Sequence, residues 1–370
     1  MTMMSKNFKI ITWTNSSTNQ QKSEASNDIR KRLTIWAIKY QVNQNAVSDL
    51  LKLLKQHKCF ENDLPSDART LLRTPRCTDV REVQPGKYVH FGLLGNIINY
   101  LKQLKSTPEL VCVQINIDGL PIANSSGNQF RPILYSILDS TYPVFTVGLY
   151  SGYHKPESIH EYLKDFVEES CLLYKNGISY SGETVNFKIC AFICDAPARA
   201  YITQIKSHTG YFGCGKCTVK GKYVDQRVAL LKTTCELRTD ASFRERKQQK
   251  HHNGNSILKD LPIDMVNSFP YEYMHLTCLG VMRKLLFLWI KGERKIFKLS
   301  RNLVNQLDEE LRRVRQCTPL EFARKPRSSR EADRWKATEL RQLLLYTGPV
   351  VLKKSFPKNT MSYSYPCIRL

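Results

Sequence analysis

Apolar and polar residues alternate in several short stretches near the middle of the chain, and this alternation predicts β-strands. Between the third and fourth stretches, helical spacing begins after Ser158, and Glu161 three residues later completes a capping box. The predicted order is therefore strand, strand, strand, helix, strand. The four strand-like stretches are 111–120, 131–138, 143–150 and 187–197.

A carboxylate stands at the end of the first and of the fourth predicted strand. Asp118 leads into a Gly-Leu-Pro turn, and Asp195 precedes Ala-Pro. If both strands are central and adjacent, the two side chains meet at one edge of the sheet. This order of elements and acids is the layout of a ribonuclease-H-like nuclease core, so we expect an α/β fold with a mixed sheet flanked by helices. Alternatively, Asp118 begins an ordinary Asp-Gly turn and Asp195 only caps a helix that starts at Pro197.

A metal-dependent nuclease site needs a further acid from another part of the chain, because two Mg²⁺ or Mn²⁺ ions require carboxylates from separate segments. The candidates are Glu272, Glu293 and Glu339. Glu339 is favoured because it lies beside Leu343 at i+4, near the apolar stripe of a predicted helix over 331–346. The predicted catalytic and Mg²⁺-binding residues are Asp118, Asp195 and Glu339.

Cys214 and Cys217 form a C-x-x-C pair among glycines, which is typical of a zinc knuckle. His275 and Cys278, one helical turn apart, are the favoured second half of a structural Zn²⁺ site. The glycines argue against a redox dithiol, and chance placement of buried cysteines is the alternative. Weaker substitutes for the second half are His208, His251 and His252.

The remainder of the chain reads mainly as helices. Helical periodicity begins near Asp28, with Asn43 or Asn45 as a break, and 88–105 reads as an amphipathic helix. The first two helices form either a hairpin packed on the core or a helix-turn-helix that contacts DNA. The predicted division is a flexible arm at 1–27, a helical N-terminal region at 28–105, a catalytic core at 106–210, a C-x-x-C and His insertion at 211–280, and a C-terminal helical part at 281–370 that completes the core.

The chain carries a formal net charge of +23, which favours a polyanionic partner such as nucleic acid. The basic run at 243–250 is expected to bind phosphates. Twelve cysteines without a recognisable signal peptide indicate a reducing compartment. The longest apolar run, 285–290, is too short to cross a bilayer, so we expect no membrane association.

Several strings together resemble the transposases of animal cut-and-paste DNA elements of the CACTA, Mirage and Chapaev type. The resemblance runs from about residue 30 to 355. The strings are INIDGLPIANSSGNQFRPIL, VGLYSGYHKPESIHEYLKDFVEE, ICDAPARAYITQIKSHTGYFGCGKC, YEYMHLTCLGVMRKLL and RWKATELRQLLLYTGPVVL.

The resemblance implies a ribonuclease-H-like domain with an acidic triad, and Mg²⁺-dependent DNA cleavage and joining. It places the triad on Asp118, Asp195 and Glu339, the zinc-type pair on Cys214 and Cys217, and a Met-His motif on Met274 and His275.

The chain also departs from the family pattern. Glu272 stands where the family often has Asp, and Arg131 stands where an aromatic residue is expected. Family members usually continue well beyond the Gly-Pro-Val-Val strand at 348–351, so we expect the chain to be truncated at its C-terminus.

The expected function is that of a nuclear DNA transposase, a homo-oligomer when active. Water activated between Asp118 and Asp195 is expected to cleave the element end, and the freed 3′-hydroxyl then attacks target DNA. The alternatives are a catalytically inactive transposase-derived protein that binds nucleic acid, and an RNA nuclease or junction resolvase on the same fold.

Overall fold

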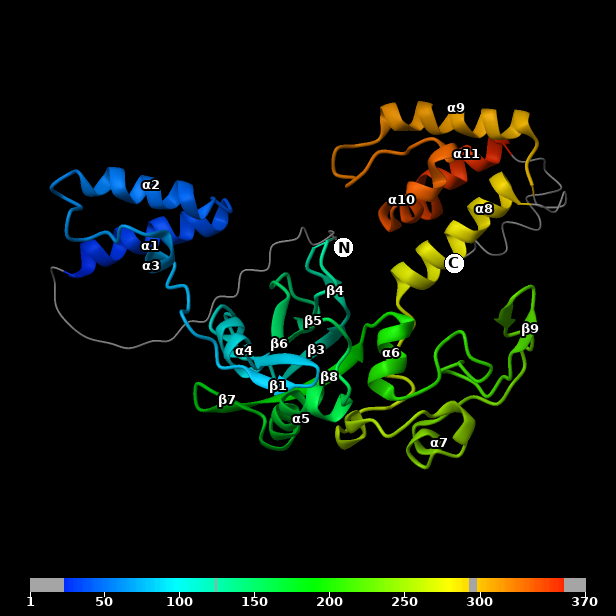
Figure 1. The fold of residues 1–370 in the computed structure, drawn as a ribbon, viewed down its shortest axis with the longest axis horizontal. Helices are drawn as coiled ribbons and strands as arrows, with labels where there is room; N and C mark the ends of the chain where they lie inside the picture. The colour runs from blue at the N-terminus through cyan, green and yellow to red at the C-terminus, as the bar shows by residue number, and fades with distance from the viewer. Residues whose placement is uncertain (1–22, 124, 293–297, 356–370) are drawn as a thin grey trace. The chain divides into compact units, whose positions relative to one another are not determined.

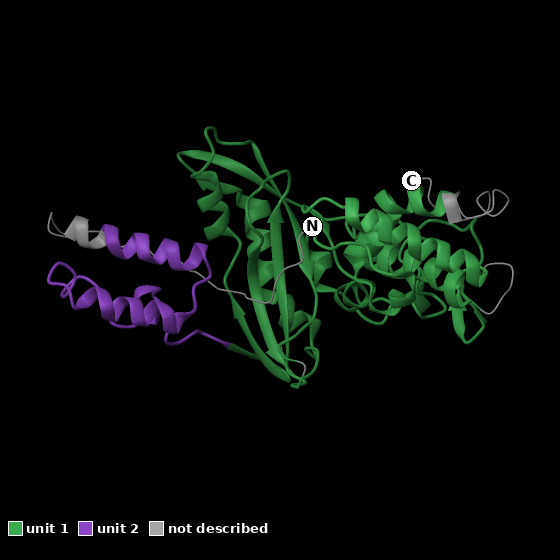
Figure 2. Cartoon of the chain, turned by 90° about the horizontal axis from the view of Figure 1, so that it is seen from above, with its two compact units in different colours: residues 1–4, 81–370 green, residues 5–80 purple. Residues whose placement is uncertain are grey.

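The computed structural model describes residues 23–123, 125–292 and 298–355 (Figure 1). The chain divides into two compact units, a smaller one within residues 5–80 and a larger one that contains residues 81–370 (Figure 2). Most of the predicted flexible arm, residues 1–22, lies outside the described residues. Helix α1 begins at Ser23, inside the range predicted for that arm.

The smaller unit consists of three helices, α1 (Ser23–Lys39), α2 (Gln44–Lys55) and α3 (Ala68–Leu71). The predicted break before the second helix is confirmed, because the Asn43 side chain accepts a hydrogen bond from the Asn45 N–H at 2.9 Å and caps α2. The three helices share a small apolar core of their own. Its buried members are Ala37, Val47, Leu51, Leu64, Ala68 and Leu71.

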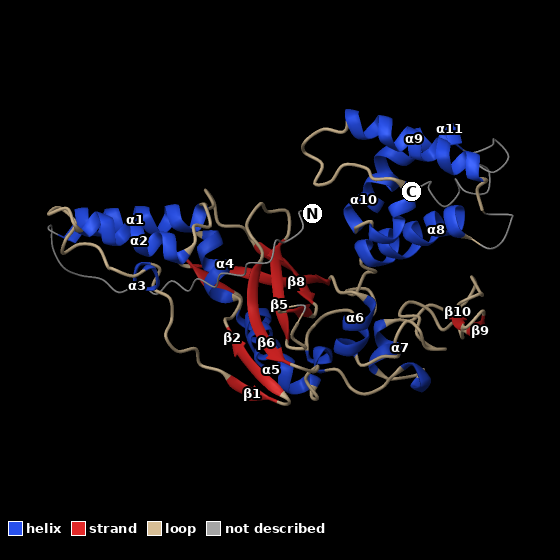
Figure 3. Cartoon of the chain, turned by 45° about the horizontal axis from the view of Figure 1, so that its top comes forward, coloured by secondary structure: helices blue, strands red, loops and turns tan. Residues whose placement is uncertain are grey.

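A mixed sheet forms the centre of the larger unit (Figure 3). Its strand order is β1-β2-β6-β5-β3-β8-β7, with β4 paired to β5. Strands β3, β5 and β6 are antiparallel neighbours, whereas β3 and β8 run parallel. The strands are β1 (Arg81–Val83), β2 (Gly86–His90), β3 (Leu110–Ile117), β4 (Leu120–Pro121), β5 (Gln129–Ile137), β6 (Phe145–Gly152), β7 (Ile178–Tyr180) and β8 (Glu183–Phe192).

The hairpin β1-β2 corrects one sequence-based prediction. Residues 88–90, predicted to begin a helix, belong to β2, and α4 spans only Leu94–Leu101. Tyr88 pairs with Tyr150 of β6 in the sheet and packs edge-on against Tyr162, with ring centroids 5.9 Å apart. This tertiary contact overrides the local helical pattern because it buries a large aromatic side chain.

Helix α5 (Ile159–Asn176) follows β6, leads into the hairpin β7-β8, and contacts β2, β6 and β8. The Ser158 half of the predicted capping box is confirmed, because the Ser158 side chain accepts a hydrogen bond from the Glu161 N–H at 3.2 Å. The Glu161 carboxylate pairs with Arg81 at 3.2 Å instead of returning to the Ser158 N–H. A stripe of apolar side chains, including Phe166 at 0% exposure, faces the sheet core. By covering the crossover, α5 allows β8 to return parallel to β3.

The segment after β8 contributes apolar side chains to the core built on the sheet. It contains α6 (Ala196–Thr203), the hairpin β9 (Lys222–Val224) and β10 (Arg227–Ala229), α7 (Asp240–Arg244), and the short helices η1 (Gln249–His251) and η2 (Ile257–Asp260). Its apolar side chains join the core that is built on the sheet. They are Phe243, Leu258, Leu261, Ile263, Met265, Val266 and Phe269.

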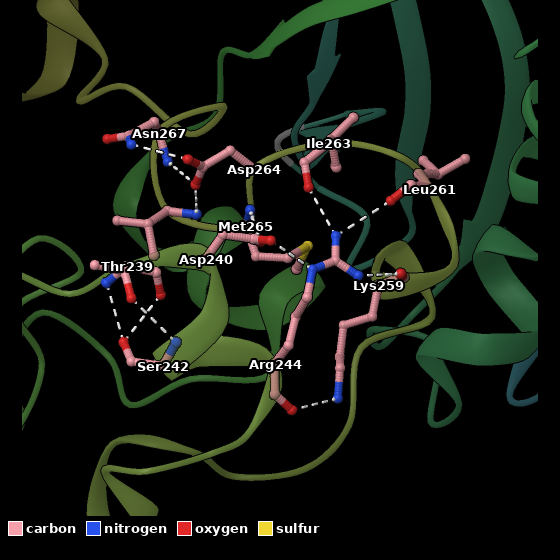
Figure 4. A network of polar contacts seen from close by, with 11 residues as sticks. Thr239, Asp240, Ser242, Arg244, Lys259, Leu261, Ile263, Asp264, Met265 and Asn267 are labelled. Atoms are coloured by element: carbon pink, nitrogen blue, oxygen red, sulfur yellow. Dashed lines mark hydrogen bonds and ion pairs between the residues drawn. The ribbon is translucent and has the colours of Figure 1, made fainter.

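Arg244 ties this segment together (Figure 4). Its guanidinium bonds to the Asp240 carboxylate at 2.7 Å and donates to the carbonyl oxygens of Lys259 at 2.6 Å and Ile263 at 2.7 Å. Asp240 also accepts from the Met265 N–H at 2.8 Å. Arg244 belongs to the basic run predicted to bind phosphates. Its guanidinium instead makes intramolecular hydrogen bonds that fix the segment 259–263 against α7.

The C-terminal part of the larger unit is helical, as predicted. It comprises η3 (Met274–Met282), α8 (Arg283–Lys291), α9 (Arg301–Cys317), η4 (Ser329–Arg334), α10 (Ala337–Gln342), η5 (Leu343–Thr347) and α11 (Gly348–Ser355). Residues 348–351, expected to form a strand, begin helix α11 instead. Burial explains the difference, because Val351 and Leu352 pack into a second core with Trp289 and Trp335.

No helix among the described residues is long and apolar enough to cross a membrane.

Candidate functional site

Asp118 and Asp195 follow the ends of β3 and β8 and line the same cavity. The two strands are parallel neighbours, and beyond the last ladder pair the Ile193 N–H donates to the Ile115 carbonyl at 2.7 Å. The Asn116 side chain adds a bond to the Ile193 carbonyl at 2.5 Å. The meeting of the two acids at one sheet edge, expected from the strand order, is therefore present.

Each acid also makes the local contact that a purely structural role predicts. Asp118 Oδ1 accepts from the Gly119 N–H at 2.7 Å, and Asp195 Oδ1 caps α6 by accepting from the Ala198 N–H at 2.7 Å. A carboxylate has two oxygens and about four acceptor positions. Capping therefore leaves each acid with the capacity to bind a cation.

The two carboxylates line one cavity of about 190 Å³. Two cationic side chains, Arg131 from β5 and Lys155, line it as well. Lys155 Nζ lies 5.6 Å from the centre of the Tyr201 ring, another part of the wall. The cavity thus combines acids that can bind a metal with cations that can bind a phosphate.

The electrostatic surroundings of Asp118 raise its pKa. Burial has the largest effect, and the negative charge of Asp195 acts in the same direction. The hydrogen bond from Gly119 and the positive charges of His275 and Arg131 oppose the shift. A divalent cation between the two carboxylates would offset the effect of Asp195 on the charged form of Asp118.

Gly119 and Arg131 are packed against each other at the wall of the cavity. A Cβ atom at position 119 would lie 2.9 Å from Arg131 Nη1, so a larger residue would displace the guanidinium. Arg131 Nη2 donates to Gln129 Oε1 at 2.9 Å, whereas its Nε is buried without a hydrogen-bond partner. An unpartnered buried donor beside a cavity suits an anionic ligand.

Glu272 fixes the orientation of His275. Its carboxylate accepts from the His275 Nδ1–H at 2.8 Å and from the backbone N–H groups of Met274 and His275 at 2.7 and 2.6 Å. Nδ1 therefore donates to Glu272; in the neutral imidazole the lone pair is then on Nε2, and in the imidazolium both nitrogens carry protons. His275 thus belongs to a Glu-His dyad, and the positive charge of its imidazolium form lowers the pKa of Asp118.

Glu339, the predicted third acid, lies in the second core instead of the cavity wall. Its side chain is 2% exposed and binds Arg327 through two bonds, at 2.6 and 2.8 Å. Its Oε2 also accepts from the Lys336 N–H at 2.8 Å, which caps α10. The structure therefore brings Asp118 and Asp195 together and holds Glu339 in an ion pair.

The C-x-x-C pair is assembled. The sulfur atoms of Cys214 and Cys217 lie 3.4 Å apart, and the Tyr271 hydroxyl lies 3.7 Å from the Cys214 sulfur. Burial acts against ionisation, but hydrogen bonds from the N–H groups of Lys216 and Cys217 and from the Tyr271 hydroxyl lower the pKa of the Cys214 thiol. Cys214 is thus prepared to act as a thiolate ligand.

The remaining zinc candidates lie in other surroundings. His275 is bound by Glu272, and Cys278 is buried beside Tyr273. His251 is 1% exposed, and its Nδ1–H donates to the Phe212 carbonyl at 2.6 Å, which leaves Nε2 buried and unpartnered. Across the described ranges, no three His, Cys, Asp or Glu side chains are grouped as a metal site.

Tyr271 links the cysteine pair to the helix that Asp195 caps. The Arg199 guanidinium of α6 stacks on the Tyr271 ring at 4.5 Å from its centre, and Lys216 Nζ lies 6.0 Å from the same ring. Arg199 is 7% exposed, and its Nε has no partner. The cation–π contact therefore couples the cysteine loop to the position of α6.

In comparisons with known proteins, no family model matches the chain, and no curated protein is significantly similar to it.

Sequence reasoning missed several residues of the site. Glu272 is predicted as a candidate third acid and not as a partner of His275, although its i to i+3 spacing to His275 on a helix could have identified the dyad. Lys155 and Tyr201 gave no local signal, because only tertiary folding brings them to the cavity. Cys235 was also missed: the bridge between Cys217 and Leu237 places it beside the C-x-x-C loop.

Proposed function

We propose that the protein is a metal-dependent DNA strand-cleaving and strand-joining enzyme of the transposase type. The observation that carries this proposal is the convergence of Asp118 and Asp195, from the ends of neighbouring parallel strands, in one cavity that also contains Arg131 and Lys155. Paired carboxylates and phosphate-binding cations in one cavity are what phosphodiester cleavage requires.

The sheet supports a ribonuclease-H-like core as the finer description of the fold. Three antiparallel strands, β3, β5 and β6, are followed by helix α5 and by β8, which returns beside β3. This is the strand order expected for such a core, with acids after its first and fourth strands. The proposal of fold and the proposal of function therefore rest on the same elements.

The residues of the cavity fit a Mg²⁺ or Mn²⁺ ion. Both acids are half-buried, and burial together with the neighbouring charge of Asp195 raises the pKa of Asp118. Bound divalent metal would supply Lewis-acid activation of water and stabilisation of the leaving oxygen. Glu339 stays a prediction for the third ligand, since reaching the cavity requires release from Arg327.

The protein's own groups would divide the remaining tasks. Arg131 and Lys155 would bind the nonbridging oxygens of the scissile phosphate. His275, held by Glu272 with its Nε2 lone pair free of the Glu272 bond, would accept a proton from water or a 3′-hydroxyl. These assignments explain why a Glu-His dyad lies within the electrostatic range of Asp118.

A structural Zn²⁺ ion on Cys214 and Cys217 is part of the proposal. The lowered pKa of Cys214 and the orphaned Nε2 of His251 fit such an ion. His251 bonds to Phe212, two residues before Cys214, and this favours it over His275 as a further ligand. His275 and Cys278 stay predictions. Metal analysis of the purified protein tests the site, and less than about half an equivalent of zinc would argue against it.

The proposed partners are DNA at element ends and target sites, and a second copy of the chain when active. The proposed location is the nucleus. The net charge of +23 supports a polyanionic partner.

Cleavage of supercoiled plasmid tests the proposed activity. We expect the wild-type protein to nick plasmid with Mg²⁺ or Mn²⁺ and not with EDTA, and Asp195→Asn to be inactive. Asn keeps the helix cap, so loss of activity would report on the carboxylate. Nicking by Asp195→Asn at the wild-type rate would contradict the assignment.

A second candidate function is binding of nucleic acid without catalysis, as in an inactive transposase-derived protein. The ion pair between Arg327 and Glu339 favours it, because a buried, paired carboxylate is not free to bind a metal. A well-folded wild-type protein that binds DNA but leaves plasmid intact with both metals would support this candidate.

A further inference from the structure

A cavity whose lining shares no residue with the proposed catalytic cavity lies between α9 and the segment 326–330. We call it the α9 cleft. Its volume of about 450 Å³ is within the range of ligand-binding clefts. Most of its wall is polar or charged, and only Leu311 and Pro326 are apolar. A wall of this kind suits a charged ligand, not an apolar one.

Four arginines and two acids line the α9 cleft. One acid is already neutralised, because Asp308 accepts from the Ser329 N–H at 2.6 Å and pairs with Arg330 at 3.3 Å. The other, Glu309, pairs with Arg313 outside the cleft at 3.4 Å. The acids are therefore balanced by partners, and the excess positive charge must come from the remaining arginines.

Arg312 and Arg315 supply this excess charge. They lie four and seven residues after Asp308 on α9, so all three side chains share one face of the helix. Arg315 Nη1 donates to the Pro326 carbonyl at 3.0 Å, a neutral acceptor that leaves its charge unbalanced. Arg312 is exposed. Two guanidinium groups one turn apart can each bind a phosphate through a planar fork.

We propose that the α9 cleft is a second DNA contact, which binds the phosphodiester backbone away from the cleavage site through Arg312 and Arg315. The net charge of +23 favours a polyanionic ligand. The choice of DNA as that polyanion rests on the proposed function. A contact of this kind positions the duplex and carries no sequence information.

Salt-dependent binding of a labelled 30-bp duplex tests the proposal. Each lost phosphate contact lowers the slope of log K against log salt by about 0.9. We expect Arg312→Ala/Arg315→Ala to reduce the slope by about two and to weaken binding about tenfold at 50 mM KCl. Arg312→Lys/Arg315→Lys keeps the charges and should retain most of the slope.

A matched control removes the same charge elsewhere on the helix. Lys298 and Arg301 are exposed at the start of α9. By the helical rise, Arg301 lies about 21 Å from Arg315, farther than the Debye length of about 8 to 10 Å. Lys298→Ala/Arg301→Ala should therefore bind with nearly the wild-type slope. Circular dichroism establishes that each variant is folded.

Equal slopes and affinities for the cleft variant and the control variant would overturn the proposal. So would loss of binding to poly-glutamate with DNA binding unchanged, because the cleft would then recognise an acidic polypeptide. Plasmid nicking by the wild type is a separate result. If the wild type nicks plasmid but the Arg312→Ala/Arg315→Ala variant binds DNA with an unchanged salt slope, the α9 cleft is not a DNA contact and the proposed function still stands.

Discussion

Arg327 holds Glu339 through two hydrogen bonds, from Nε at 2.6 Å and from Nη2 at 2.8 Å. The carboxylate is 2% exposed, whereas the guanidinium is 26% exposed. Loss of the partner therefore has a different energetic cost for each of the two charges. Arg327 without Glu339 can be solvated, but Glu339 without Arg327 becomes an uncompensated buried charge.

Arg327→Ala should lower the free energy of unfolding by about 3 kcal/mol, and Glu339→Gln by less, because Gln leaves no buried charge. Urea denaturation at pH 7 measures both.

The Arg327 contact also lowers the pKa of Glu339 against the effect of burial. The pair should therefore stabilise the fold above the ordinary Glu value near 4.5, and this contribution should be lost as the pH falls through the lower folded value. Equal costs for both variants would contradict the account.

The raised pKa of Asp118 predicts that this carboxylate lowers stability in the absence of metal. An acid with a raised folded pKa costs nothing below its ordinary value and destabilises as the pH rises through the folded value. Asp118→Asn should therefore raise the melting temperature in EDTA at pH 7 by about 3 °C, which corresponds to about 1 kcal/mol. Differential scanning calorimetry measures the change.

Mg²⁺ should stabilise the wild type more than Asp118→Asn, since the ion needs the carboxylate. Glu183→Gln, at the exposed start of β8, serves as a control that removes an acid of no proposed function. A lower melting temperature for Asp118→Asn than for the control would show that the Asp-Gly turn, not the cavity, governs this residue.

Two substitutions of Asp195 should separate its structural role from its proposed catalytic one. Asn retains the side-chain oxygen that accepts from the Ala198 N–H, whereas Ala removes it. Asp195→Ala should unfold about 1 kcal/mol more easily than Asp195→Asn, and both should be equally inactive in plasmid nicking. If the nicking activities of the wild type, Asp195→Asn and Asp195→Ala fall in the same order and proportion as their stabilities, Asp195 acts only as a helix cap.

The Tyr271 hydroxyl should control the reactivity of Cys214. Tyr271→Phe keeps the ring on which Arg199 stacks and removes the hydrogen bond to the Cys214 sulfur. The pKa of Cys214 should rise, and the pH profile of its reaction with a disulfide reagent in EDTA should move to higher pH. Tyr211→Phe, at an exposed tyrosine, is the control. An unchanged profile for Tyr271→Phe would show that the backbone N–H groups alone set the thiol pKa.

The sequence predicted those parts of the fold whose signals are local. Strand β3 alternates buried and partly exposed residues along its length, and α5 has both an N-cap serine, Ser158, and an apolar stripe. Asp118 and Asp195 could be paired in advance because the ends of parallel neighbouring strands meet at one sheet edge.

The remaining features depend on contacts between distant residues, which a single sequence does not show. Tyr88 lies in a strand because its ring packs against Tyr162. Arg244 was grouped with phosphate-binding residues because its neighbours are basic, yet its guanidinium is used by three backbone carbonyls and Asp240. Glu339 was placed near a buried margin correctly, but its pairing with Arg327 depends on how the 318–336 segment folds back.

The central claim is that Asp118 and Asp195 bind one divalent cation together, and anomalous diffraction from crystals soaked in Mn²⁺ tests it most directly. The account predicts a manganese peak between the two side chains, about 2.2 Å from a carboxylate oxygen of each. The peak should disappear in Asp195→Asn. Manganese bound only at other residues, or carboxylates that stay apart in a crystal saturated with the ion, would contradict the claim.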